Sequence, residues 1–435
     1  MENPLLITPL VQPVDATVAI PGSKSITNRA LLLAALAKGR SHLNGALFSD
    51  DTRYMARALS TLGVAVRAAE SESSFEVDGN GGHIPAREAD LFLGNSGTSI
   101  RFLTAFVALG EGTYRLDGIE RMRQRPIGDL LDALRQLGVD ARAENDDDCP
   151  PVVVRSNGLK GGKARLKADV SSQYLSALLM VAPLADGDLA DGDIEIELDG
   201  VLASQPYIEM TLRMMEQWGA RVENDDFRRF RIVGGQGYRA MEYSIEPDAS
   251  GASYFFAAAA LTGGRVRVPG LNKNSLQGDT AFVDVLAQMG CDVEYSADFI
   301  EVRGGNTLRG VDVDMNAISD TVMTLAAIAP FAEGATRIRN IGHIRHKETD
   351  RIHALATELK RLGVRVEETA DSLTIHPARA LKPANIETYD DHRMAMSFAI
   401  TGLRAPGVAI CDPDCVNKTF PDFWQRLGEL EAGLL

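Results

Sequence analysis

The sequence has few of the residues that build disulfide frameworks or metal sites. Its 435 residues contain only four cysteines, none in a CxxC spacing, and seven histidines without a ligand-like pairing. Sparse, unpaired cysteines are typical of reduced thiols in a cytoplasmic protein. We therefore expect neither a disulfide-rich secreted domain nor a metal site.

Long apolar runs and an excess of positive charge are missing as well. No segment reaches the roughly 20 apolar residues of a membrane-spanning helix, and the start of the chain, MENPLLITPL, lacks the basic and apolar parts of a secretion signal. With 45 basic against 60 acidic residues, the net charge is −15. Such a charge disfavours nucleic acid and anionic membranes as partners, so we expect a cytoplasmic protein that binds neither.

Common nucleotide-binding and hydrolase signatures are also absent. Residues 21–39, PGSKSITNRALLLAALAKG, look like a phosphate-binding loop, but GSKS lacks the second glycine of GxxxxGK[ST]. No GxGxxG follows a strand-like segment, and neither GxSxG nor HExxH occurs. These absences argue against a P-loop enzyme, a dinucleotide-binding fold, a serine hydrolase and a zinc hydrolase.

In place of these signatures, the sequence contains six copies of one helical pattern. Each copy has small or polar residues at its head, then a nearly all-apolar run, then a glycine that stops it. The first residues of the copies, 71 to 79 positions apart, are Gly22, Gly94, Asp169, Asp248, Asp320 and Asp391. Because a helix that is apolar on every side must be covered by protein on every side, we predict six buried helices.

A second, amphipathic helix alternates with the first, as in DDTRYMARALSTLGV. Strand-like runs such as VAVRA follow it, so each unit reads as a buried helix, strands, a surface helix and another strand. Glycines close these surface helices at Gly63, Gly138, Gly219, Gly290 and Gly363. This pattern predicts an α/β (α+β) fold. Six units could form a closed ring, an open solenoid or two globules of three; the repeats diverge and lack capping units, which argues against a solenoid, and we choose two globules.

The predicted boundaries make one domain discontinuous. Residues 22–246 form the N-terminal domain, and residues 1–21 plus 247–435 form the C-terminal domain, each with three units. The strand-like segment TVAI precedes the first unit and would complete the C-terminal domain. The chain is then expected to cross between the domains near Pro21 and Pro247.

Basic and hydroxyl residues gather at the predicted helix heads. A single serine there is usually a helix cap, and a single lysine is usually a surface charge. Here they recur in an acidic chain, and helix N-termini favour anions, so we predict a site for phosphate and carboxylate groups. These heads carry Lys24, Ser25, Arg29, Asn95, Gly97, Thr98, Arg101, Arg125, Ser171, Ser172, Gln173, Ser204, Lys347, Arg351, His392, Arg393 and Lys418.

Two carboxylates, Asp320 and Glu348, stand among these cations. Each has an ordinary structural explanation, because Asp320 could be a helix cap and Glu348 a charge at a helix N-terminus. The alternative is an acid and a base beside bound anions, which suits proton transfer at a small phosphorylated substrate.

Seven stretches together resemble the enolpyruvyl transferase family, in particular its members that use shikimate-3-phosphate. They are PGSKSITNRALLLAALAKG, LGNSGTSIRFLTA, RMRQRPIGDL, SSQYLSALLM, HKETDRI, DDHRMAM and NKTFPDF, spread from residue 21 to residue 423. The resemblance implies two domains of three repeated units, with buried parallel helices wrapped by sheets and outer helices and the active site in the cleft between the domains. It also implies transfer of the enolpyruvyl group of phosphoenolpyruvate to the 5-hydroxyl of shikimate-3-phosphate, through a tetrahedral intermediate, by a monomer without metal or organic cofactor.

The resemblance further implies a role for each matching residue. Shikimate-3-phosphate would be held by Lys24, Ser25, Arg29, Ser171, Ser172, Gln173, Ser204, Asp320, His343 and Lys347. Phosphoenolpyruvate would be held by Lys24, Asn95, Gly97, Thr98, Arg125, Gln173, Arg351, Arg393 and Lys418. Asp320 would accept the proton of the 5-hydroxyl, Glu348 would protonate the methylene carbon of phosphoenolpyruvate, and Lys24 would span both substrates. Tyr207 and His392 are further candidates.

Two positions depart from the family pattern. Phe102 stands where the family commonly has proline, just behind the wall formed by Gly97 and Thr98, so we expect an altered sensitivity to glyphosate, which competes with phosphoenolpyruvate in the family. His343 stands where some relatives have asparagine, which leaves its substrate contact open.

Two other functions were weighed against this one. The sister enzymes that act on UDP-N-acetylglucosamine carry a reactive cysteine in the N-terminal half, where this chain has only Cys149, in the different context DDDCPPVVV. A non-catalytic anion-binding protein of the same fold would not need Asp320 and Glu348 among its cations.

Overall fold

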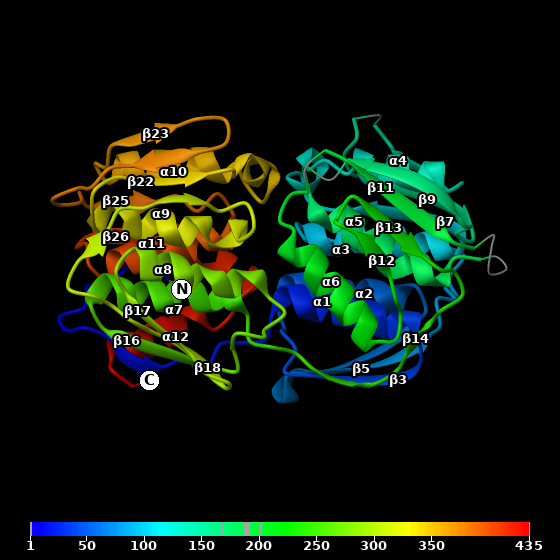
Figure 1. Cartoon of the computed structure of the whole chain (residues 1–435), viewed down its shortest axis with the longest axis horizontal. Coiled ribbons are helices and arrows are strands. Elements are labelled where there is room, and N and C mark those ends of the chain that lie inside the picture. Colours follow the sequence, from blue (N-terminus) through cyan, green and yellow to red (C-terminus); the bar gives the residue numbers. More distant parts are fainter. Residues whose placement is uncertain (1, 146, 168, 187–191, 201, 435) are drawn as a thin grey trace. The chain divides into compact units, whose positions relative to one another are not determined.

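The computed structural model describes residues 2–145, 147–167, 169–186, 192–200 and 202–434. The chain separates into two compact units, Gly22–Ile245 and Met1–Pro21 with Glu246–Leu435, called the N-terminal and C-terminal units below. Glu246 falls in the C-terminal unit, where its carboxylate accepts a hydrogen bond from the Leu276 amide at 3.0 Å. Both units combine helices and sheets (Figure 1), which confirms the predicted α/β fold.

Three buried helices form the centre of the N-terminal unit. They are α1 (Lys24–Leu36), α3 (Gly97–Phe106) and α5 (Ser172–Val181). Every residue of α3 is buried, and Ser25 is the only residue of α1 that is not. Helix α3 packs against both α1 and α5. The outer helices, each with one buried and one exposed face, are α2 (Asp50–Thr61), α4 (Gly128–Gln136) and α6 (Pro206–Gln217).

The C-terminal unit repeats this arrangement. Its buried helices are α7 (Ala249–Thr262), α9 (Val322–Ile328) and α11 (His392–Gly402), and all three contact one another. Its outer helices are α8 (Phe282–Gln288), α10 (Arg351–Arg361) and α12 (Phe423–Glu431). The six buried helices expected from the repeat are therefore confirmed. In the described part of the chain, no helix has the length and apolar character needed to cross a membrane.

Small sheets surround the buried helices of each unit. The N-terminal sheets have the strand orders β14-β3-β5-β4, with β15 also on β3, β6-β7-β9-β8 and β10-β11-β13-β12. Their strands are β3 (Ala37–Asn44), β4 (Ala65–Ala69), β5 (Ser74–Asn80), β6 (Glu88–Phe92), β7 (Glu111–Asp117), β8 (Asp140–Ala143), β9 (Val152–Asn157), β10 (Gly162–Lys167), β11 (Ile194–Asp199), β12 (Glu223–Asp225), β13 (Arg229–Ile232), β14 (Tyr238–Arg239) and β15 (Glu242–Ser244).

The C-terminal sheets have the orders β17-β18-β16-β2, β20-β22-β24-β23 and β1-β26-β25, and β19 pairs with β21. Their strands are β1 (Leu5–Leu6), β2 (Asp15–Thr17), β16 (Arg265–Pro269), β17 (Asp292–Tyr295), β18 (Phe299–Arg303), β19 (Leu308–Arg309), β20 (Asp312–Asp314), β21 (Ala332–Glu333), β22 (Thr336–Arg339), β23 (Val366–Glu368), β24 (Leu373–Ile375), β25 (Ala384–Ile386) and β26 (Val408–Ile410).

Most buried helices are crossovers between two parallel neighbouring strands. Helix α3 joins β6 to β7, α5 joins β10 to β11, α9 joins β20 to β22 and α11 joins β25 to β26. Parallel neighbours require such a connection, because a tight turn cannot return the chain to the same end of a sheet. The crossover also covers the helix with its own sheet, which is why its sequence is apolar nearly all round.

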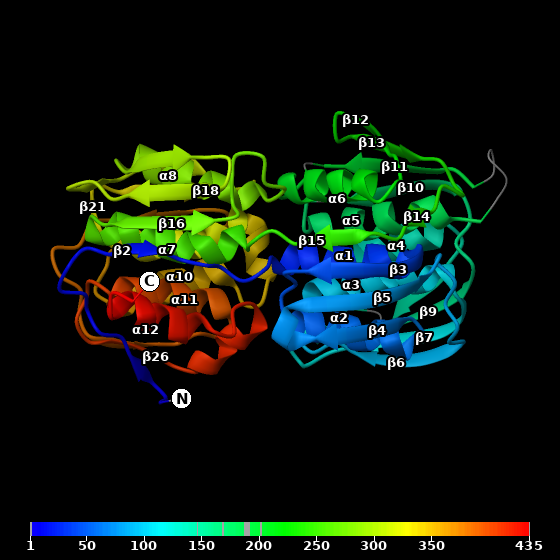
Figure 2. The ribbon, with the colours of Figure 1, turned by 90° about the horizontal axis from the view of Figure 1, so that it is seen from below.

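Strand β2, the last strand before α1, breaks this rule and makes the C-terminal unit discontinuous. β2 precedes α1 in sequence but pairs in parallel with β16, with Asp15 opposite Arg265, as Figure 2 shows for the blue β2 beside the green β16. β15 takes the corresponding place beside β3, with Glu242 opposite His42. The strand expected at TVAI begins two residues earlier than predicted, although the Val18 amide still donates to the Arg267 carbonyl at 2.8 Å.

The glycines predicted to close the outer helices have the left-handed conformation that the position requires. Their φ angles lie between 82° and 105°, a region that side chains with a Cβ atom rarely adopt. These residues are Gly63, Gly138, Gly219, Gly290 and Gly363.

Candidate active site

The predicted site residues form two groups, one in each unit. The N-terminal group occupies the heads of α1, α3 and α5 and the segments that lead into α4 and α6. The C-terminal group occupies the head of α11, the short 3-10 helices η6 (Ser319–Thr321), η8 (Gly342–His346) and η9 (Pro413–Lys418), and the segment before α10.

Lys24 is the first residue of α1 and is nearly buried. Ser23 caps the helix by accepting a hydrogen bond from the Ile26 amide at 3.4 Å. The Lys24 ammonium lies 3.5 Å from a carboxylate oxygen of Asp51, whose side chain is 2% exposed. The buried Asp51 carboxylate therefore fixes the lysine at the head of the helix.

The heads of α3 and α5 are joined through Gln173. Its amide nitrogen donates to Thr98 Oγ1 at 3.0 Å, and its amide oxygen accepts from Arg101 Nη1 at 2.6 Å. Ser171 caps α5 by accepting from the Gln173 amide at 3.3 Å. Ser172 follows it as the first residue of α5 and is 6% exposed. Thr98, Ser171, Ser172 and Gln173 thus lie close together at the heads of α3 and α5.

Arg125 lies across the head of α3. Its Nη1 donates to the backbone carbonyl of Asn95 at 3.0 Å and to the Asn95 side-chain oxygen at 3.2 Å. A Cβ atom on Gly97 would lie 2.4 Å from Arg125 Nη2. The close passage of this guanidinium therefore requires glycine at position 97.

Ser204 and Tyr207 lie where the chain enters α6. Ser204 is 3% exposed and has a φ of 54°, a conformation that is uncommon for a residue with a side chain and that concentrates at functional sites. The Tyr207 carbonyl accepts from Arg29 Nη2 at 3.3 Å, which links this segment to α1.

Arg351 is the centre of the C-terminal group. Its guanidinium donates to both carboxylate oxygens of Asp391, at 2.8 and 3.2 Å, to Glu348 at 2.9 Å and to Asp320 at 3.2 Å. Arg393 Nη2 donates to the other Asp320 oxygen at 2.7 Å. Burial opposes the charge of Arg351, but Asp391, Glu348 and Asp320 raise its pKa above the ordinary value, so the guanidinium stays cationic at every relevant pH.

Neither carboxylate occupies the N-cap position of a helix. Asp320 lies within η6, and the residue that caps α9 is Thr321. Helix α10 is capped by Asp350, which accepts from the His353 amide at 3.1 Å. Glu348 is 7% exposed and pairs with Arg351. Both acids are therefore placed where they meet arginines rather than where they would finish a helix.

Three further predicted residues of this unit, His343, Lys418 and His392, are buried. His343 is 9% exposed, and burial together with the nearby Lys347 lowers its pKa to about 4, so its imidazole is neutral near pH 7. Lys418 is 8% exposed at the end of η9. His392 is fully buried, with Nδ1 3.7 Å from Asp391 Oδ1.

Comparison with known proteins identifies the family. The sequence model of EPSP synthase (3-phosphoshikimate 1-carboxyvinyltransferase) matches residues 10–427. The chain belongs to the EPSP synthase family. It is similar to relatives named 3-phosphoshikimate 1-carboxyvinyltransferase from Nostoc sp., with 54% identity over 422 residues (97% of this chain, 98% of the relative), and from Sulfurovum sp., with 48% identity over 432 residues (99% and 100%).

A solved EPSP synthase from Acinetobacter baumannii has the same fold. It superimposes with a TM-score of 0.82 at 26% sequence identity and covers 99% of this chain and 98% of its own. The resemblance to enolpyruvyl transferases that the motifs indicated is confirmed.

The sequence analysis did not single out several acidic residues that lie beside the predicted site residues. In the sequence, Asp51 and Asp391 are acidic residues within the stretches SDDTR and DDHRM. Both stand at helix heads, whereas the other predicted site residues at helix heads are mostly basic or hydroxyl residues. Asp279, 5% exposed, accepts a short hydrogen bond from the Ser250 hydroxyl. Burial and the neighbouring Asp320 raise the pKa of Asp279 to about 6. No motif marks it, because its place depends on the packing of α7.

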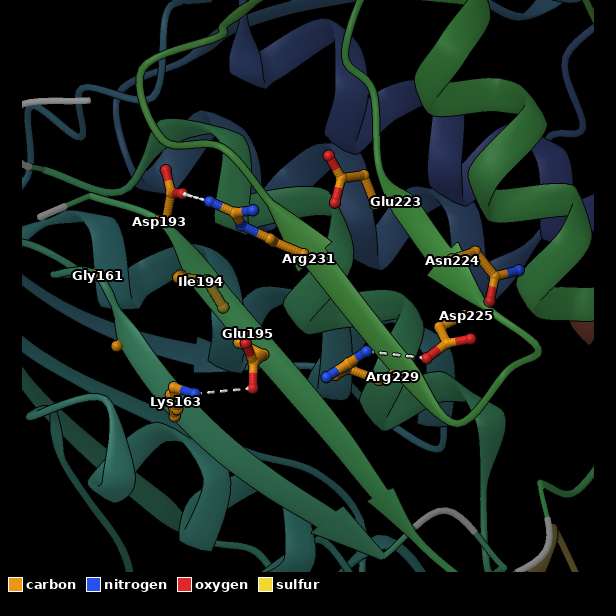
Figure 3. A pocket seen from close by; sticks show the side chains of 11 residues that line it. Gly161, Lys163, Asp193, Ile194, Glu195, Glu223, Asn224, Asp225, Arg229 and Arg231 are labelled. Carbon is orange, nitrogen blue, oxygen red and sulfur yellow. Dashed lines mark hydrogen bonds and ion pairs between the residues drawn. The ribbon is translucent and has the colours of Figure 1, made fainter. Parts of the chain in front are cut away.

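The groove in Figure 3 contains none of the predicted site residues. Its lining residues belong to the strands of the sheet β10-β11-β13-β12 or stand next to them in the chain. Its cations are paired within the same face at 3.0 Å each, in the pairs Lys163–Glu195, Arg231–Asp193 and Arg229–Asp225. Exposed pairs of this kind contribute little to stability, and they leave no excess positive charge for an anion.

Proposed function

We propose that this protein transfers the enolpyruvyl group of phosphoenolpyruvate to the 5-hydroxyl of shikimate-3-phosphate and releases inorganic phosphate, a step of chorismate and aromatic amino acid biosynthesis. The observation that carries the proposal is the similarity of nearly the whole chain, at 48–54% identity, to relatives whose name states this activity. The pairing of Asp320 and Glu348 with arginines supports it, because the reaction needs an acid and a base beside anions.

The N-terminal unit supplies most of the shikimate-3-phosphate site in this proposal. Serines at helix heads offer hydroxyl groups, and the helix N-termini favour the phosphate. The residues are Lys24, Ser25, Arg29, Ser171, Ser172, Gln173, Ser204 and Tyr207, with Asp320, His343 and Lys347 from the C-terminal unit. Because His343 is neutral near pH 7, it acts as a hydrogen-bonding group rather than as a cation.

Phosphoenolpyruvate carries a phosphate and a carboxylate, so several cations must surround it. Arginine suits both groups because its guanidinium forms two parallel hydrogen bonds. The residues are Lys24, Asn95, Gly97, Thr98, Arg125, Gln173, Arg351, Arg393 and Lys418. His392 supports this set through Asp391 rather than by contact with the substrate, since its ring is fully buried.

The chemistry proceeds by addition and elimination. Asp320 takes the proton of the 5-hydroxyl while that oxygen bonds to C2 of phosphoenolpyruvate, and Glu348 gives a proton to C3. The Glu348 carboxylate then takes a proton back from C3 while the C2–O bond to phosphate breaks, which restores the double bond, and the proton on Asp320 goes to the departing phosphate. Cations around the phosphate stabilise it as it departs.

The arginines hold the two carboxylates in place. Asp320 and Glu348 accept hydrogen bonds from Arg351, and Asp320 accepts another from Arg393. An anionic substrate that binds Arg351 and Arg393 competes with the carboxylates for the same donors.

The proposal is tested by phosphate release from phosphoenolpyruvate in the presence and absence of shikimate-3-phosphate. We expect release that requires shikimate-3-phosphate and that persists in EDTA, since the proposed reaction uses no metal. Release that requires UDP-N-acetylglucosamine instead would establish the sister activity. The structure gives no support to that activity, because burial, together with Asp147 and Asp148, raises the pKa of the Cys149 thiol and so makes it less reactive.

We further propose that the protein works as a monomer in the cytoplasm, with no nucleic acid or membrane partner. Sedimentation of the purified protein at micromolar concentration checks the first point. A sedimentation coefficient that corresponds to a dimer of the 46.9 kDa chain would contradict it.

A further inference from the structure

Arg29 is a buried cation whose hydrogen-bonding partners are all neutral. It is 2% exposed, and burial lowers its pKa to about 10. Nε donates to Thr211 Oγ1 at 2.8 Å, Nη2 to Ser176 Oγ at 3.1 Å and to the Tyr207 carbonyl at 3.3 Å, and Nη1 to the Ser25 carbonyl at 3.2 Å. Within the described ranges, no carboxylate forms an ion pair with it.

Two aromatic rings face this guanidinium. Its Cζ atom lies 5.2 Å from the centre of the Phe102 ring and 5.9 Å from the centre of the Tyr207 ring. Phe102 is on α3 and is fully buried. A cation above the face of an aromatic ring is attracted by the negative potential of that face, and the attraction is stronger where water is excluded.

We propose that Phe102 is a positioning residue for shikimate-3-phosphate, because its ring holds the Arg29 guanidinium in the orientation that binds the anionic substrate. The inference rests on the proposed function, in which Arg29 belongs to the shikimate-3-phosphate site. Phe102 acts only through Arg29.

An aromatic ring suits this task better than a carboxylate. A buried charge must be compensated, but a carboxylate beside Arg29 would compete with the anionic groups of the substrate for the guanidinium. Neutral acceptors and a ring face stabilise the cation while leaving its net charge uncancelled. The buried Arg29 guanidinium therefore keeps one full positive charge available to the substrate.

Phe106 provides a matched control for the role of Phe102. It lies one turn further along α3 and is equally buried. It makes no cation–π contact with the described residues. Substitution of either phenylalanine by leucine creates a similar cavity, so a difference between the variants reports the contact with Arg29 rather than the loss of packing.

The experiment measures the dissociation constant of shikimate-3-phosphate by calorimetry on the full-length protein. We expect Phe102→Leu to raise this constant roughly 3- to 30-fold, the effect of losing a cation–π contact, and Phe106→Leu to leave it within about twofold of wild type. A second pair replaces each phenylalanine by pentafluorophenylalanine, which keeps the ring shape but reverses the charge distribution of its face. The fluorinated ring is expected to weaken binding at position 102 only.

The outcomes separate this inference from the proposed function. If wild type binds no shikimate-3-phosphate, the proposed function fails. If wild type binds it but the variants at 102 match those at 106, the proposed function stands and the positioning role of Phe102 is wrong. Should Phe102→Leu fail to fold, the fluorinated variant decides, because it leaves the packing in place.

Discussion

Arg351 shows how far the proposed chemistry depends on single side chains. One buried guanidinium contacts Asp391, Glu348 and Asp320, and Arg393 also donates to Asp320. A buried charge that loses its partner costs several kcal/mol, so this cluster is sensitive to every change of charge. Its acids can be tested one at a time.

Glu348→Gln keeps the shape of the side chain but removes the acid that we propose protonates phosphoenolpyruvate. We expect turnover to fall by at least about 100-fold, as for the loss of a general acid, while both substrates still bind. Steady-state phosphate release and calorimetric titration measure the two effects. The control Glu367→Gln changes an exposed residue of β23; near-normal turnover in Glu348→Gln would remove this residue from the mechanism.

His343→Asn tests the burial of a neutral histidine. The pKa of His343 is lowered to about 4 in the folded protein, against about 6.5 in an unfolded chain. The unfolded state therefore takes up the extra proton first, and the stability that the neutral ring provides is lost as the pH falls from about 6.5 towards 4.

In urea unfolding between pH 7.5 and 4.5, we expect the wild type to lose up to about 3 kcal/mol more than His343→Asn. His83→Asn replaces an exposed histidine and serves as the control for the substitution itself. Parallel curves for wild type and His343→Asn would show that the histidine is protonated without cost.

The altered sensitivity to glyphosate stays a prediction. Phe102 packs against Arg29, so a change there affects the shikimate-3-phosphate side as well as the wall behind Gly97. The inhibition constant of glyphosate against phosphoenolpyruvate, compared with that of a relative with proline at this position, measures the difference. Equal constants would refute it.

The helices position these side chains through their first turns. The bodies of α1, α3, α5, α7, α9 and α11 are apolar because they are covered by sheets, whereas their heads carry the polar groups. A helix head offers unpaired amides and a partial positive charge, so one architectural element is repeated to build an anion site. At the head of α3, a larger residue in place of Gly97 would force the Arg125 guanidinium to move.

Gly97→Ala tests that constraint at the head of α3. The new Cβ atom would lie 2.4 Å from Arg125 Nη2, so the guanidinium must move away from Asn95. We expect the KM for phosphoenolpyruvate to rise by a factor of 10 or more, about 1.4 kcal/mol, with a small effect on shikimate-3-phosphate binding. Gly428→Ala in α12, where a Cβ atom meets nothing within 4 Å, is the control; an unchanged KM in Gly97→Ala would show that Arg125 does not hold the substrate.

In each unit, one sheet includes a strand that leads, along the chain, into a helix of the other unit. β2 pairs with β16 although it leads into α1, and β15 pairs with β3 although it leads into α7. At both points where the chain passes from one unit to the other, the last strand before that point is therefore hydrogen-bonded within the unit that the chain is leaving. This arrangement makes residues 1–21 part of the stability of the C-terminal unit.

Val18→Ala tests that coupling. Val18 is fully buried and its amide donates to Arg267, so the cavity should cost roughly 2 kcal/mol. We expect amide hydrogen exchange to quicken in β16 and to stay unchanged in β3. Val77→Ala in β5, also fully buried, should do the reverse; faster exchange in β3 upon Val18→Ala would contradict the strand exchange.

The sequence by itself determined the repeat, the buried and amphipathic helices, the glycines that end the outer helices and the family. These features are local, since they follow from side-chain periodicity and from the conformations that single residues adopt. Only the tertiary structure decided which carboxylates hold which cations. Asp51 beside Lys24, Asp391 beside Arg351 and the Phe102 ring beside Arg29 each join residues at least 27 positions apart, and such contacts depend on how the helices pack rather than on any pattern along the chain.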